Sequence, residues 1–252
     1  NGVSLLIFVG IVGRLPVLLG RTALTINQEL FFNMGAFAVL SVLVIATVVF
    51  VNQAIRRIPV YYAKRIKGNK VYQGATNYLP LKLNQAGVIP IIFAVSFVLM
   101  PQLIGNFLRY VKNPAVAGIA TFLANAFNPS GFFYNLFYFI LVVAFTFFYT
   151  VVVFNPQKIA DEIQKNGGFI PGIRPGLATK QFLEKIVYKI TSVGALFLGI
   201  IAVLPALVSK LTGMNELVIG GTGILIVVSV ILETFKTIEA QLIMKSYDKF
   251  AK

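Results

Sequence analysis

The chain has 252 residues, of which 58% are hydrophobic and only 12% are charged, and its formal net charge is +14. Soluble domains carry about a quarter charged residues, so this composition excludes an ordinary soluble domain and indicates an integral membrane protein whose helices face lipid. The chain contains no cysteine and no histidine. Disulfides, thiol chemistry, the usual general base near neutral pH and the commonest zinc sites are therefore excluded.

Six apolar segments approach the length of about 20 residues that a helix needs to span the hydrocarbon of a bilayer. They run over about 3–20, 34–51, 86–103, 132–154, 186–208 and 218–238. Arg14 and Pro16 interrupt the first segment, and Pro90 and Pro101 lie in the third. Membrane helices tolerate proline, because neighbouring helices and water satisfy the freed carbonyls. The pattern predicts an all-α polytopic membrane protein with six transmembrane helices.

The basic residues gather on one side of this arrangement. Two long polar connections, at about 52–85 and 155–185, share a side if all six segments span the membrane. The first connection holds seven basic residues, the second and its helix edge hold six, and the C-terminal tail holds four. This side therefore carries 17 basic residues, and the other side carries four. By the positive-inside rule, both long loops and both ends of the chain are cytosolic. On the other side, the apolar stretch 105–131 fits a short helix in the interface.

No signature of an enzyme occurs in the chain. The strings GxxxxGK[ST], HExxH and GxSxG are absent. Glu233 is the one acidic residue inside a predicted span, which leaves no proton relay of the kind that ion-coupled transporters use. The GGTG string at 220–223 resembles a phosphate loop only weakly, and close helix packing is the favoured use of its glycines. We expect no catalytic residue, no metal and no cofactor.

The first long loop is patterned as a β-hairpin. Apolar and aromatic residues at Ile58, Val60 and Tyr62, and then at Val71, flank the string KGN, which places a basic tip at 67–70. The charges could serve only to fix the topology. That role does not explain an ordered hairpin projecting from the membrane, so docking of a cytosolic partner is the favoured interpretation.

The second long loop is patterned as a short helix, a Gly-Gly stop and a turn with two prolines around Arg174. Proline and glycine in this arrangement fix the backbone of a turn, so we expect Arg174 to be presented on a rigid, exposed loop.

Five strings resemble the SecY family, the channel subunits of the bacterial protein translocase: NGVSLLIF, LPLKLNQAGVIPIIF, FFYTVVVFNP, GFIPGIRPG and GGTGILIVV. They occur in the family's order and spacing across essentially the whole chain. The resemblance identifies residues 1–252 as the C-terminal half of a SecY-like channel, its fifth to tenth transmembrane helices. The family's N-terminal half, with its plug helix, is then expected as a separate partner.

The resemblance also assigns roles to individual residues. It implies a pore ring of aliphatic side chains at mid-membrane, formed by Val3, Ile7, Ile92 and Ile226. It implies a lateral gate at the third predicted helix, with Asn84, Gln85, Val88 and Ile89 along the seam and Pro90 loosening the backbone. An equal alternative for Asn84 is a simple helix cap. Docking of the motor ATPase SecA and of the ribosome is implied for Lys64, Arg65, Lys67, Lys70 and Arg174. Asn69 stands where many relatives have a basic residue, which weakens the expected contact with ribosomal RNA.

The resulting expectation is a passive protein-conducting channel in the bacterial plasma membrane. It passes unfolded secretory polypeptides and signal sequences, releases hydrophobic segments sideways into membrane lipid, and works with SecE, SecG, SecA and the ribosome. An alternative is a secondary transporter of a small solute, which fits the broken first and third helices but not the lack of mid-membrane acids. A third interpretation is a membrane scaffold whose basic loops only recruit partners.

Overall fold

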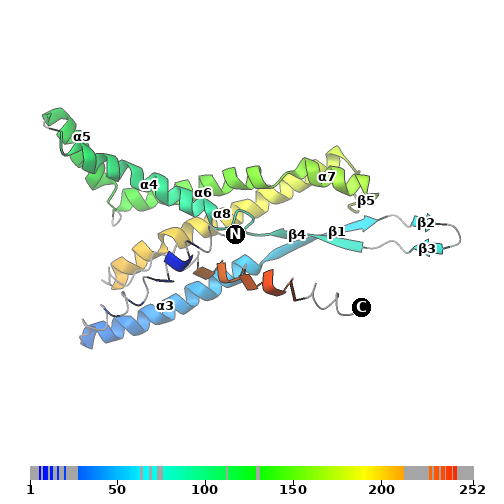
Figure 1. Ribbon diagram of the computed structural model, residues 1–252, viewed down its shortest axis with the longest axis horizontal. Helices are drawn as coiled ribbons and strands as arrows, with labels where there is room; N and C mark the ends of the chain where they lie inside the picture. The colour runs from blue at the N-terminus through cyan, green and yellow to red at the C-terminus, as the bar shows by residue number, and fades with distance from the viewer. Residues whose placement is uncertain are drawn as a thin grey trace.

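The structure is a computed structural model, and it shows a helical bundle from one end of which a β-ribbon projects (Figure 1). It describes the following residues: 6, 8–10, 12–13, 16, 20, 28–62, 65–67, 70–72, 76–111, 113–128, 131–212, 227–228, 230–232, 234–235, 237–239 and 241–242.

Four long helices and two short ones are described as continuous elements, and the described residues between 227 and 242 are helical as well. The long helices are α3 (Gln28–Gln53), α4 (Ile89–Leu108), α6 (Phe132–Val153) and α8 (Leu177–Thr212). The short ones are α5 (Pro114–Ala126), which packs against α4 at the end of the bundle away from the ribbon, and α7 (Pro156–Lys165), which packs against α8 (Figure 1). Helix α5 lies within the stretch where a short helix was expected.

The hairpin predicted in the first long loop is present. Strand β1 (Ile55–Tyr62) pairs antiparallel with β4 (Thr76–Lys82), in a register that runs from Ile55 opposite Lys82 to Tyr61 opposite Thr76. Strands β2 (Arg65–Lys67) and β3 (Lys70–Tyr72) continue the ribbon to its tip. The sequence did not predict a further strand, β5 (Gly168–Phe169), which adds to the outer edge of β1 and gives the sheet order β4-β1-β5.

The buried apolar side chains form two separate hydrophobic cores. The first, here called the bundle core, joins α3, α4, α6 and α8 and is centred on residues such as Val48, Ile91, Val142 and Leu198. The second, here called the loop core, joins the base of the hairpin to α7 and to the start of α8. It is formed by Ile58, Val60, Leu81, Ile163, Ile170, Leu183, Val187 and Ile190. Helix α8 runs through both cores and so connects them rigidly.

Three helical stretches in the described part of the chain are long and apolar enough to cross a membrane: Ile89–Leu108, Phe132–Lys165 and Leu177–Leu204. The second of these includes both α6 and α7, and the 22 residues of α6 are enough by themselves. In α3 the described apolar stretch is shorter, Ala38–Gln53. The segments expected at 3–20 and 218–238 lie mostly outside the described residues.

Candidate functional site: the loop end of the bundle

The two long loops meet at one end of the bundle, here called the loop end. Tyr61 and Tyr62 of β1 pair with Phe169 and Gly168 of β5, and the rings of Tyr61 and Phe169 stack with their centroids 6.1 Å apart. No side chain fits at Gly168, because a Cβ there would lie 2.9 Å from the Tyr62 ring and 3.1 Å from the carbonyl oxygen of Ile163. The hairpin and the second loop therefore form a single platform.

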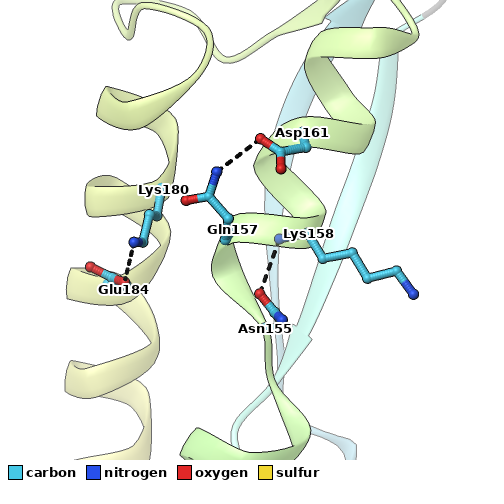
Figure 2. A network of polar contacts seen from close by, with 6 residues as sticks. All are labelled: Asn155, Gln157, Lys158, Asp161, Lys180 and Glu184. Atoms are coloured by element: carbon cyan, nitrogen blue, oxygen red, sulfur yellow. Dashed lines mark hydrogen bonds and ion pairs between the residues drawn. The ribbon is translucent and has the colours of Figure 1, made fainter.

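Local sequence explains how the second loop folds. Asn155 caps α7, since its side-chain oxygen accepts a hydrogen bond of 3.0 Å from the backbone N–H of Lys158, and Pro156 occupies the first turn (Figure 2). The helix ends before Gly167, whose φ of 71° belongs to the left-handed region that glycine adopts without strain. This arrangement agrees with the short helix and Gly-Gly stop that the sequence predicted.

Arg174 lies in the turn that leads from β5 into α8. Its carbonyl oxygen accepts a hydrogen bond of 2.9 Å from the hydroxyl of the buried Thr179. Gly172 and Gly176 on either side have φ values of 78° and 95°, which fix the direction of the chain. The Arg174 side chain is exposed, and the structure shows no ion pair between it and any described carboxylate. The backbone is thus held in place while the guanidinium is exposed to solvent.

An open recess of about 540 Å³ adjoins Arg174. Its walls come from the end of α7, the β5 strand and the glycine-rich turn, and include Gln164, Phe169, Gly172 and Ile173. A recess with an exposed aromatic ring and a guanidinium at its edge can accept an apolar side chain beside an acidic one.

Three of the other predicted docking residues lie toward the tip of the ribbon. Arg65, Lys67 and Lys70 belong to β2 and β3, where Lys67 and Lys70 are paired directly opposite each other at the turn. Lys64 lies outside the described residues. The tip projects well beyond the platform that carries Arg174 (Figure 1). The structure therefore places the basic tip and Arg174 on the same end of the molecule but at different distances from the bundle.

Asn84 lies at the junction between the hairpin and α4. Its side chain is buried, and its amide nitrogen donates to the side-chain oxygen of Asn52 at 3.3 Å and to the carbonyl oxygen of Gly87 at 3.2 Å. Helix α4 begins only at Ile89, after Val88 as its N-cap residue, and no side chain caps it. The helix-cap interpretation of Asn84 is therefore wrong. The residue instead ties the start of α4 to the end of α3.

The remaining gate residues follow Asn84 into α4. Gln85 and Ile89 are half-buried, and Val88 is buried in the bundle core. The expectation that Pro90 loosens the helix is also wrong. Pro90 occupies the first turn of α4, where its missing N–H breaks no helical hydrogen bond, whereas Pro101 is the proline inside the helix.

Of the predicted pore ring, only Ile92 is described. It is half-buried on α4 and packs against the bundle core. Val3, Ile7 and Ile226 lie outside the described residues, so the ring itself stays a prediction.

Sequence reasoning missed the residues that hold the loop end together. Leu183 and Gly194 of α8 are two of these, because Leu183 is fully buried in the loop core and a Cβ on Gly194 would lie 2.6 Å from the carbonyl oxygen of Leu83. The available signal was the amphipathic start of α8, where apolar residues recur at 183, 187 and 190 ahead of the uniformly apolar stretch.

The fold and the loop end define a class of protein: a polytopic membrane protein whose helical bundle carries an ordered, basic platform at one end. The SecY family model matches residues 1–235, and the chain belongs to the SecY family.

The chain is 45% identical over 255 residues to the protein translocase subunit SecY of Thermus thermophilus, an alignment that covers 99% of this chain and 56% of that protein. It is 44% identical over 262 residues to the protein translocase subunit SecY of Mycobacterium tuberculosis, covering 100% of this chain and 58% of that protein. The chain therefore spans a little over half the length of these relatives.

Two solved structures share the fold at 19% sequence identity. One is of a SecY protein whose plug domain is described as stabilising the closed state of its translocation channel, with a TM-score of 0.57 over 93% of this chain and 58% of that one. The other is a protein-conducting channel, with a TM-score of 0.53 over 91% of this chain and 54% of that one.

Proposed function

We propose that this chain forms half of a protein-conducting channel in the bacterial plasma membrane. It passes unfolded secretory polypeptides and releases hydrophobic segments sideways into lipid. The observation that carries the proposal is the SecY match over residues 1–235, together with relatives that are protein translocase subunits. An N-terminal half, SecE and SecG complete the channel in this proposal.

In the proposed topology the chain spans the membrane six times, and both chain ends and the loops 52–85 and 155–185 are cytosolic. Two observations support it. The loops pack together through the β1–β5 pairing and the loop core, as loops on one side of a membrane can. The basic residues are concentrated in the same loops.

The cytosolic platform is the proposed docking site for SecA and the ribosome. Arg174 would pair with an acidic group of the partner, and the basic ribbon tip would contact ribosomal RNA or a second acidic surface. Because the 36-residue helix α8 runs from the loop core into the bundle core, a force applied at the platform reaches the membrane helices directly. The partner, not this chain, supplies the energy.

The pore in this proposal is lined at mid-membrane by Val3, Ile7, Ile92 and Ile226, and the segment 84–89 that leads into α4 forms a wall of the lateral gate. Aliphatic side chains make no hydrogen bonds to ions or water, so a ring of them blocks leakage by dewetting and still yields to a passing chain. No cofactor is needed for such a conduit.

Photo-cross-linking from α4 tests the proposal. A photo-reactive residue replaces Ile92, the chain is co-expressed with the proposed N-terminal half and SecE, and a secretory protein is stalled in transit. A matched probe replaces Phe97, whose ring faces α6 with its centroid 5.2 Å from that of Phe145. We expect a cross-link to the stalled polypeptide from Ile92 and none from Phe97. An assembled complex that gives no cross-link at Ile92 would contradict the pore assignment.

A further inference from the structure

A groove lies between α6 and α8 near the loop end, with a volume of about 280 Å³. Phe147, Thr150 and Val151 form its α6 wall, and Val187, Tyr188 and Thr191 form its α8 wall. The groove results from the way α6 and α8 pack. The two helices approach closely at Gly199, where a Cβ would lie 2.6 Å from the Phe139 ring, and nearer the loop end the larger side chains of Phe147 and Tyr188 lie between them with ring centroids 5.5 Å apart.

In the proposed topology the groove lies where hydrocarbon gives way to lipid headgroups. The apolar stretch Leu177–Leu204 has 28 residues, several more than the roughly 20 that cross the hydrocarbon, and the proposed topology places the first turns of α8 outside the hydrocarbon on the loop side. Two groove residues are strongly exposed, Val151 at 77% and Tyr188 at 67%. In a spanning helix, such apolar exposure faces lipid. Tyrosine is also typical of the membrane interface.

Charged side chains lie at the loop-end mouth of the groove, where Glu184 is the one charged residue of the lining and two lysines lie close by in the sequence. Lys180 lies one turn before Glu184, which lines the groove, and the two form an exposed ion pair of 3.9 Å (Figure 2). Such pairs are weak, so Lys180 is free to exchange partners. Lys185 is exposed beside them. Side chains on a helix tilt toward its N-terminus, which directs both lysines away from the hydrocarbon and toward the headgroups. Across residues 155–191 the chain has six basic and three acidic residues.

We propose that this groove binds one phospholipid with a negatively charged headgroup. One acyl chain lies between α6 and α8 along Phe147, Val151 and Val187, and the headgroup phosphate contacts Lys180 and Lys185. The proposal needs α6 and α8 to span the membrane, and it does not depend on polypeptide transport.

A second groove between the same helices provides an internal control. It lies at the opposite end of the pair and has a volume of about 210 Å³. It is lined by apolar residues such as Leu136, Val203 and Leu207 and by no charged side chain. One basic residue, Lys210, follows it in the last turn of α8. The two grooves thus have similar volumes and differ in the charged side chains that line them or lie near them.

The test uses proteoliposomes that contain a trace of phosphatidylglycerol with a photo-reactive group in its acyl chain. After illumination, labelled peptides are mapped by mass spectrometry, and a parallel sample uses photo-reactive phosphatidylcholine. We expect phosphatidylglycerol to label 147–154 and 184–191 about fivefold more than it labels 132–139 and 203–207, a factor of the order expected for a basic residue near anionic lipid. Phosphatidylcholine is expected to show no such preference.

Variants separate the two parts of the site. Val151→Trp fills the groove and should abolish the preferential labelling, whereas Leu207→Trp in the second groove should leave it unchanged. The double variant Lys180→Gln/Lys185→Gln should reduce phosphatidylglycerol labelling to the level of phosphatidylcholine. Lys158→Gln is its matched control, because the Lys158 side chain extends away from α8 (Figure 2). Equal labelling of both grooves, equal labelling by both lipids, or labelling that Val151→Trp does not change would overturn the proposal.

Discussion

Arg174 illustrates how a single residue can be presented without being buried. Its carbonyl oxygen is held by Thr179, and its side chain is exposed beside the open recess. We expect Arg174→Glu to reduce SecA-driven export by about tenfold or more, because reversing a docking charge replaces attraction by repulsion. Export of a reporter protein by membrane vesicles measures this effect. Lys165→Glu, an exposed change at the end of α7, is the matched control and should retain export. Normal export by the Arg174 variant would contradict the docking role.

A glycine at which two backbones meet gives a second prediction at the scale of single residues. A Cβ at Gly194 would lie 2.6 Å from the carbonyl oxygen of Leu83, and that atom belongs to the backbone and cannot move alone. We expect Gly194→Ala to destabilise the chain by about 1–3 kcal/mol, the usual cost of overpacking. Gly118→Ala on α5 meets nothing within 4 Å, so it should be neutral or stabilise the chain by up to about 1 kcal/mol. Thermal unfolding in detergent compares the two variants. Equal melting temperatures would show that α8 does not need this close contact.

At the scale of elements, the loop core packs the hairpin and α7 against the start of α8, so we expect the hairpin and α7 to unfold together. Leu183 of α8 is fully buried between them. We expect Leu183→Ala to cost about 2–5 kcal/mol of local stability, because it removes a large buried side chain and leaves a cavity. Hydrogen exchange should then accelerate in 55–62 and 156–165 together, while α6 stays protected. Leu177→Ala, at an exposed position, should leave all of these segments unchanged. Faster exchange in only one of the two segments would show that they are not coupled.

The helices and strands also show which structural features local sequence patterns can predict and which they cannot. The alternation of Ile58, Val60 and Tyr62 predicted the ribbon, and the Gly-Gly pair predicted the end of the short helix α7, because these signals are local. The two-residue strand β5 carries no such signal, since it is defined only by its contact with β1. Pro90 suggested a weakened helix because the apolar pattern begins several residues before it. In the structure, α4 begins only at Ile89, so Pro90 lies in its first turn. The long-range contact between Asn84 and Asn52 likewise has no local pattern.

For the molecule as a whole, the two ends of the bundle differ in charge and in form. The loop end carries the basic ribbon and platform, and the opposite end carries α5 (Figure 1). Exposed apolar side chains at that end include Phe107 near the end of α4 and Ile119 and Phe122 of α5. Many large apolar side chains elsewhere on the helices are exposed as well, Val42, Phe50 and Phe148 among them. These faces need lipid or further helices to cover them. Since the chain spans a little over half the length of its relatives, the proposed N-terminal half is a natural partner for part of this surface.

The proposed topology can be mapped with single cysteines, because the chain has none of its own. We expect Asn77→Cys on the ribbon and Leu177→Cys at the start of α8 to be protected from a membrane-impermeant maleimide in intact cells and to react after permeabilisation. Tyr110→Cys, at a position just beyond α4 that is 88% exposed, should react in intact cells, because a helix of 20 residues carries the chain across the hydrocarbon. The cysteine-free chain is the blank. Labelling of Asn77→Cys and Leu177→Cys from opposite sides would contradict the shared platform, whereas labelling of all three positions from outside would leave the platform intact and reverse only the proposed orientation.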